Sequence, residues 1–235
     1  MITFQRVDRI EAVFAPRDWP FARERRSEIA THWAKLVGEK PALFNGRVLV
    51  QYERRVEGGV LFARYLETDF ATFIAWRDFG WPDREIVNGF AMAALRSRDN
   101  AFLLGEMGPH TANAGKVYFA AGTPDPDDVT PDGRLDLRGS AVRELVEETG
   151  LEASDITVGE GWTVVTEGQR MAFMRPVALD MDAREARALI LSRLAAQERP
   201  ELSDIRVVRD VAEIDREAMP PYICAYLEYA FANRE

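Results

Sequence analysis

Three glutamates in the middle of the chain, Glu144, Glu147 and Glu148, have the spacing that brings carboxylates to one face of a helix. At about 100° per residue, Glu148 lies roughly 40° and Glu147 roughly 300° around the helix from Glu144. Carboxylates this close repel one another unless a cation neutralises them, and Mg²⁺ and Mn²⁺ prefer oxygen ligands. The spacing therefore predicts a site for a divalent metal ion, Mg²⁺ or Mn²⁺. The alternative is an ordinary acidic helix face exposed to solvent.

The residues around these glutamates complete the pattern of an amphipathic helix. Ala141 and Leu145 fall on the adjoining arc, where they can pack against a core. Asp136 is placed to cap the start of the helix, and Gly150 is placed to end it in a conformation of positive φ. The sequence thus predicts a helix from about residue 136 to 150 with one acidic face and one buried face.

Residues 143–151 fill every specified position of the pattern R-E-U-x-E-E-x-G-U, in which U is aliphatic. The chain therefore resembles the Nudix hydrolases. The resemblance implies an α/β (α+β) fold, an α/β/α sandwich around a mixed sheet, and metal-dependent cleavage of a nucleoside diphosphate linked to another group. It also implies roles in the site. Glu147 and Glu148 are expected as principal metal ligands and Glu144 as a ligand or water-orienting base. Arg143, beside Glu147 on the helix, is expected to fix its carboxylate.

The loop before the helix departs from the family pattern, which begins G-x5-E-x7 before the arginine. Gly122 and Asp128 have the first spacing, with Asp in place of Glu, but fourteen residues then precede Arg143. We infer a seven-residue insertion at 129–135. The family's first Glu helps to orient the arginine, so Asp128 or Asp136 is expected in that role. A backbone carbonyl at Gly122 is expected to contact metal.

Further site residues are expected outside the motif. In the family, one more acidic residue commonly serves as metal ligand or base, and the candidates are Glu167 and Glu201; each is otherwise a solvated side chain. Arg96 and Arg98 could reach a substrate phosphate, although a hairpin turn usually exposes such residues to solvent.

Composition excludes several other classes of function. The net charge of −9 argues against broad nucleic-acid binding. No apolar run is long enough for a membrane span, and no signal-peptide pattern is present, so we expect a cytoplasmic protein. One cysteine excludes an internal disulfide, and two histidines make a zinc site improbable.

The chain divides into an N-terminal extension, residues 1–85, and a hydrolase domain, residues 86–235, with a soft boundary at the Gly80–Asp83 cluster. The extension is expected to contain helices and a β-hairpin that turns at Gly58-Gly59. Strands are expected at 4–14, 47–52, 60–66, 86–95, 101–104, 116–119, 162–166, 171–179 and 205–208. Further helices are expected at 19–37, from a cap at Thr68, and at 182–196 and 221–231.

The substrate is predicted less directly. The extension and loop resemble UDP-sugar-hydrolysing Nudix proteins at 43–46, 68–73, 88–91 and 122–126, which favours an NDP-sugar such as UDP-glucose. Residues 115–119 resemble the G-x-V-x-F stretch of coenzyme A-cleaving members, but 103–114 lacks their arginines. ADP-ribose stays open, as does a homodimer formed through the extension. A Nudix-fold ligand sensor without catalysis is the alternative from another class, but such proteins usually lack motif glutamates.

Overall fold

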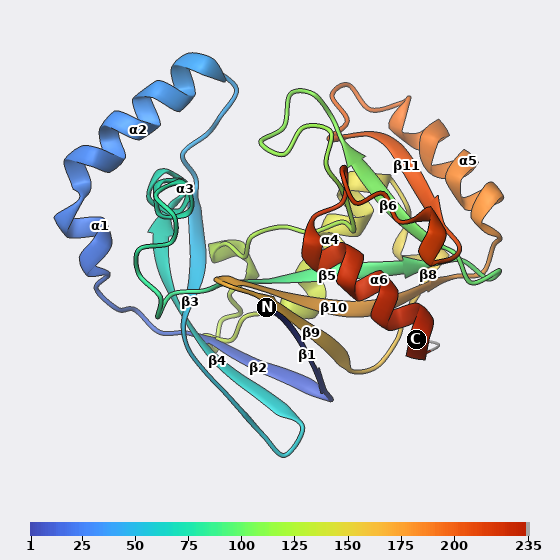
Figure 1. Cartoon of the computed structure of the whole chain (residues 1–235), viewed down its shortest axis with the longest axis horizontal. Coiled ribbons are helices and arrows are strands. Elements are labelled where there is room, and N and C mark those ends of the chain that lie inside the picture. Colours follow the sequence, from blue (N-terminus) through green and yellow to red (C-terminus); the bar gives the residue numbers. More distant parts are fainter. Residues whose placement is uncertain (234–235) are drawn as a thin grey trace.

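The computed structural model describes residues 1–233 and contains two sheets (Figure 1). The large sheet has the strand order β1-β9-β10-β5-β6-β11, with β7 paired to β6 and β8 to β10. It is mixed, because β10 runs parallel to β5 and antiparallel to β9. Its strands are β1 (Ile2–Val7), β5 (Asn88–Arg96), β6 (Phe102–Met107), β7 (Val117–Tyr118), β8 (Ile156–Val158), β9 (Trp162–Glu167), β10 (Arg170–Leu179) and β11 (Leu202–Val208).

The small sheet has the order β2-β4-β3 and carries the N-terminal helices. It contains the expected hairpin, with β3 antiparallel to β4 across the Gly58-Gly59 turn. The helices α1 and α2 form the outer edge of this end of the molecule (Figure 1). The elements are β2 (Arg9–Phe14), α1 (Pro20–Glu24), α2 (Arg26–Glu39), β3 (Arg47–Glu57), β4 (Val60–Asp69) and α3 (Phe70–Asp78).

The large sheet is covered on both faces, which confirms the expected α/β/α arrangement. Alternate side chains of β5 point to opposite faces, as in any strand. Phe90 and Met92 pack with α6 (Pro221–Asn233) on one face. Ala93 and Leu95 pack on the other face with α4 (Leu137–Thr149) and α5 (Ala183–Leu194). The helix of the acidic motif is therefore held against the centre of the sheet.

Side-chain caps fix the starts of three helices. Asp136 accepts a hydrogen bond from the Gly139 amide at the start of α4, as expected, and Asp182 caps α5 in the same way. The expectation for α3 was wrong by one residue, because Asp69 and not Thr68 accepts the hydrogen bond from the Thr72 amide. Thr68 is instead the last but one residue of β4, whose ladder extends to Asp69.

The N-terminal segment contributes to both sheets. The strand β1 pairs along its full length with β9 of the large sheet, whereas β2 pairs with β4 of the small one. The boundary near residue 85 stays a prediction. The first strand, β1, belongs to the large sheet. Within residues 1–233, none of the helices combines the length and apolarity that a bilayer span needs.

Candidate active site

The motif helix α4 is built as its sequence dictates. Ala141 and Leu145 are buried in the core, and Gly150 ends the helix with φ of 69° in the left-handed region. Arg193 of α5 donates a hydrogen bond of 2.8 Å to the Gly150 carbonyl and joins the two helices. These contacts leave the side chains of Glu144 and Glu148 facing the loop that follows β7.

Two of the three motif glutamates face that loop, Glu148 buried and Glu144 half-buried. Glu148 is 5% exposed, and its Oε1 accepts a hydrogen bond of 3.3 Å from the Ala121 amide. Burial, followed by repulsion from Glu144, raises the pKa of Glu148 to about 8. Burial also raises the pKa of Glu144 to about 7, against the opposing effect of Arg143. Two carboxylates that are costly to ionise without a cation thus stand side by side.

Gly122 is required by the close approach of this loop to the helix. A Cβ atom built at Gly122 would collide with the carboxylate of Glu144. The loop is anchored on its other side, where the Leu49 amide donates a hydrogen bond of 2.6 Å to the Pro124 carbonyl. The backbone at residues 121–122 is therefore held directly beside Glu144 and Glu148, in the place where the resemblance puts a metal-contacting carbonyl.

Asp128 takes the position beside Arg143. The Asp128 side chain is buried, and its Oδ1 lies 2.9 Å from Nη2 of Arg143 as an ion pair without the alignment of a hydrogen bond. Its Oδ2 accepts hydrogen bonds from the Asp125 amide and the Ser140 hydroxyl. Of the two candidates for this role, Asp128 therefore contacts the arginine, whereas Asp136 caps the helix.

The expected contact between Arg143 and Glu147 is wrong. Arg143 faces Asp128, and its Nη2 lies 3.8 Å from Oε1 of Glu144. Glu147 is exposed to solvent, close enough to raise the pKa values of Glu144 and Glu148 by repulsion. The physical reason is the depth of Asp128: a buried carboxylate attracts the guanidinium more strongly than an exposed one.

The segment 129–135 forms a small hairpin of its own. Val129 and Leu135 pair as an isolated bridge, and the turn between them contains Gly133 in the left-handed region. The hairpin is attached to the edge of β2, because the Leu135 amide donates to the Ala12 carbonyl. It lengthens the loop without displacing Asp128 from Arg143.

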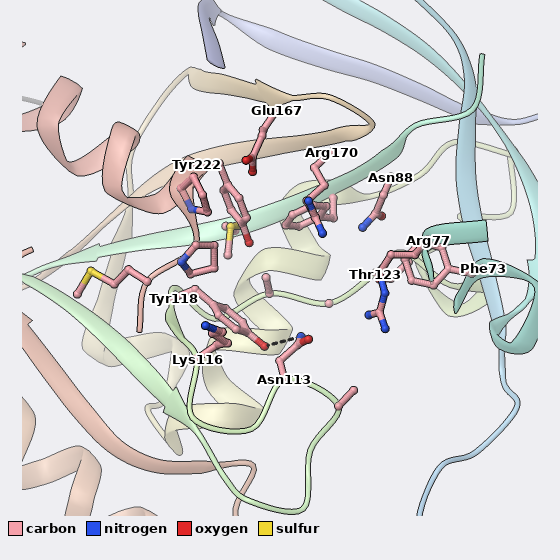
Figure 2. A pocket seen from close by; sticks show the side chains of 18 of the residues that line it. Phe73, Arg77, Asn88, Asn113, Lys116, Tyr118, Thr123, Glu167, Arg170 and Tyr222 are labelled. Carbon is pink, nitrogen blue, oxygen red and sulfur yellow. Dashed lines mark hydrogen bonds between the residues drawn. The ribbon is translucent and has the colours of Figure 1, made fainter. Parts of the chain in front are cut away.

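The two acidic candidates outside the motif occupy different places. Glu201 lies just before β11 and is near enough to raise the pKa values of Glu144 and Glu148. Glu167, at the end of β9, instead lines a cavity beside Arg170 and Tyr222 (Figure 2). Glu201 is thus the one that adds charge to the motif glutamates.

A cavity of about 440 Å³ lies between α3 and the large sheet. The backbone of residues 121–123 forms part of its wall, so the cavity adjoins the loop that contacts Glu144 and Glu148, although these glutamates do not line it. Aromatic side chains and cations are both among the residues that line it (Figure 2). The aromatic members are Phe70, Phe73, Trp81, Phe90, Tyr118 and Tyr222, and the cations are Arg77, Lys116, Arg170 and Arg216.

The two arginines singled out from the sequence lie elsewhere. Arg96 is the last residue of β5, and the Arg96 guanidinium lies over the Phe102 ring. Asn88, at the other end of the same strand, lines the cavity. Arg98 is exposed and pairs with Asp180. The cations of the cavity were missed because Arg77, Lys116 and Arg216 belong to segments that meet only after folding. Arg170 is the one cation of the cavity that lies close in sequence to a candidate site residue, because it follows Glu167 by three positions.

The donor set of the motif fits a hard divalent cation. Within residues 1–233, no three histidine, cysteine, aspartate or glutamate side chains already form a metal cage. Mg²⁺ does not need one, since it is usually held by one or two carboxylates together with waters and substrate phosphates. Two carboxylates with raised pKa values, one buried and one half-buried, lie beside the backbone of residues 121–122 and supply that kind of partial site.

Comparisons with known proteins found no matching family model and no matching curated protein. Among solved structures, a Nudix hydrolase from M. smegmatis, RenU, is 18% identical, with a TM-score of 0.41 over 63% of this chain and 85% of that chain. The MutT protein from Methanosarcina mazei Go1 is also 18% identical, with a TM-score of 0.38 over 62% of this chain and 94% of that chain. A NUDIX hydrolase from Nitrosomonas europaea is 16% identical, with a TM-score of 0.41 over 77% of this chain and 86% of that chain. These three solved structures carry names from the Nudix class, which is the class that residues 143–151 resemble.

Proposed function

We propose that this chain is a Nudix-type hydrolase that uses a divalent metal ion to cleave the diphosphate linkage of a nucleoside diphosphate derivative. One observation carries the proposal. A complete motif at 143–151 lies on one helix, with Glu148 buried and Glu144 half-buried against the backbone of residues 121–122. A cation at this place would stabilise the ionised carboxylates, which their surroundings otherwise disfavour.

Glu148, Glu147 and Glu144 are the side chains that would hold Mg²⁺ or Mn²⁺, with the Gly122 carbonyl as a backbone ligand. When bound, such an ion lowers the pKa of a coordinated water and withdraws charge from phosphoryl oxygens. Glu144 is suited either to holding the ion or to orienting the attacking water, because its carboxylate faces the backbone of Gly122 next to Glu148. Arg143, held by Asp128, keeps a positive charge beside Glu144.

Glu201 is the acidic residue that we propose as the further ligand or base, in preference to Glu167. It acts electrostatically on both Glu144 and Glu148, whereas Glu167 acts on Tyr222 across the cavity. The preference for Glu201 over Glu167 rests only on where the two side chains lie. The sequence alone left both candidates open.

The adjoining cavity supports a nucleotide-sized leaving group. Its volume of about 440 Å³ falls within the usual range of small-molecule sites, its aromatic side chains offer faces for a planar ring, and its cations suit phosphate. We propose an NDP-sugar such as UDP-glucose as the first substrate to test, with ADP-ribose and coenzyme A as the alternatives.

The test is incubation of the full chain with Mg²⁺ and each of UDP-glucose, ADP-ribose and coenzyme A, followed by assay of the nucleoside monophosphate or of the matching coenzyme A product. We expect product from at least one compound, and none when EDTA removes the metal. Release that continues in EDTA would contradict the metal dependence. No release from any compound, together with ligand binding, would favour the non-catalytic sensor.

A further inference from the structure

Three polar side chains form a row across three neighbouring strands of the large sheet, β9, β10 and β5. Arg170 of β10 is the register partner of Glu167 on β9 and of Asn88 on β5. Directly paired residues of adjacent strands project from the same face, about 5 Å apart per strand. Glu167, Arg170 and Asn88 therefore stand side by side, and all three line the cavity (Figure 2).

Each outer member of this row has one side-chain oxygen without a hydrogen-bond partner within the described residues. Glu167 Oε2 and Asn88 Oδ1 are both buried, and neither receives a donor. The guanidinium of Arg170, on the strand between them, lies 5.1 Å from the centre of the Trp81 ring. Buried acceptors without donors are rare in folded proteins and destabilise them. Two in one cavity indicate that a ligand brings the donors.

The surroundings define what kind of donor fits. Trp81, Tyr222 and Phe73 line the same cavity, so a planar or ring-shaped group can pack beside the row. A carboxylate only accepts hydrogen bonds, and the unpaired atom of Asn88 is its acceptor oxygen. The matching group is a ring that carries N–H or O–H donors at its edge, such as a base amino group or a ribose hydroxyl.

We propose that Glu167, with Asn88 beside it, determines substrate specificity by accepting hydrogen bonds from the nucleoside part of the ligand. The inference rests on the proposed function, because it assigns the nucleoside to this cavity and the diphosphate to the neighbouring loop at 121–123. Glu167 is then a recognition residue of the cavity, and the chemistry of bond cleavage stays with the motif glutamates.

The test compares Glu167→Gln with wild type, because an amide donates as well as accepts and so changes the pattern that is read. Binding of CDP against UDP and of ADP against IDP, measured by titration calorimetry without hydrolysis, compares the amino group of cytosine or adenine with the ring N–H of uracil or hypoxanthine. Ribonucleotides against their 2′-deoxy forms test the ribose hydroxyl. The matched control is Glu198→Gln, an exposed carboxylate that does not line the cavity.

We expect wild type to prefer one member of at least one pair by about tenfold or more, and Glu167→Gln to reduce that ratio about tenfold. Loss of a preference for CDP or ADP identifies a base amino group, loss of a preference for UDP or IDP identifies a ring N–H, and loss of the ribose preference identifies a hydroxyl. Asn88→Ala is expected to reduce the same ratio and serves if Glu167→Gln does not fold. Glu198→Gln is expected to leave every ratio unchanged.

No preference in wild type, or a preference that survives both substitutions, would overturn the inference. The outcome is separable from that of the proposed function. Wild-type hydrolysis with unchanged selectivity in Glu167→Gln refutes the recognition role alone. A Glu167-dependent binding preference without Mg²⁺-dependent hydrolysis refutes the hydrolase proposal alone.

Discussion

The buried position of Glu148 predicts that the metal-free protein loses stability as pH rises. Its pKa is raised from 4.5 to about 8 in the folded chain, because burial and the neighbouring Glu144 disfavour the charged form. The stabilising contribution is fully present below the unfolded pKa of 4.5 and is lost as pH rises through about 8. Within that window, the unfolded chain binds fewer protons at this site than the folded chain does.

The size of the effect follows from the two pKa values. With 1.36 kcal/mol per pKa unit, Glu148 alone lowers the free energy of unfolding by about 3 kcal/mol between about pH 5.5 and about pH 8.5. For a chain of this length, that corresponds to a fall in Tm of roughly 6–12 °C. Glu144, with its pKa raised to about 7, acts in the same direction.

The assay is thermal unfolding in EDTA at both pH values for wild type, Glu148→Gln and Glu198→Gln. Glu148→Gln is expected to remove its own share of the fall, about 3 kcal/mol, because a neutral amide needs no counter-charge, and to leave the smaller share of Glu144. Glu198 is exposed and far from the motif in sequence, so its substitution should leave the wild-type profile. Mg²⁺ at about pH 8.5 is expected to raise the Tm of wild type and of Glu198→Gln, but that of Glu148→Gln much less. A wild-type profile in Glu148→Gln would refute the reasoning.

Three substitutions test the supports of the site. Asp136→Ala removes the cap of α4 and is expected to lower the free energy of unfolding by about 1 kcal/mol in denaturant titrations. Gly122→Ala places a methyl group against Glu144, so kcat is expected to fall at least about tenfold with little change in Tm. Asp128→Asn removes the charge that faces Arg143. We expect kcat to fall and the free energy of unfolding to fall by about 2 kcal/mol.

Matched controls separate these effects from general damage. Gly38→Ala adds a methyl group where nothing lies within contact distance, and Asp127→Asn changes an exposed neighbour of Asp128. Unchanged kcat in Gly122→Ala would show that Glu144 can move without consequence. Stability in Asp128→Asn equal to that of Asp127→Asn would contradict the ion pair, and unaltered stability in Asp136→Ala would contradict the cap.

The motif helix could be predicted from sequence because its determinants are local. Asp136, Leu145 and Gly150 each act within one or two turns of α4, so spacing alone locates the start, the buried face and the end. The direction of Arg143 was not predictable in this way. It depends on how deeply Asp128 is buried, and the hairpin at 129–135 and its attachment to β2 set that depth.

The cavity could not be predicted, because its wall comes from distant parts of the chain. Trp81 follows the N-terminal helices, Tyr222 belongs to the last helix, and the row at Glu167 exists only after three strands pair. Likewise, no local pattern indicates that β1 joins β9, about 160 residues further along the chain. Sequence periodicity predicted most of the strands but missed β8 and joined β1 to β2 as one segment, and the order of strands in the sheet depends on long-range packing.

In the proposed function, the motif glutamates of α4, with buried Glu148 among them, hold the metal that drives hydrolysis. The most direct measurement is kcat for product release, with Mg²⁺ titrated into wild type, Glu148→Gln and Glu198→Gln on whichever substrate wild type cleaves. The account predicts saturable Mg²⁺ dependence in wild type and Glu198→Gln, and a loss of at least about 100-fold in a folded Glu148→Gln. Wild-type turnover in Glu148→Gln would contradict it.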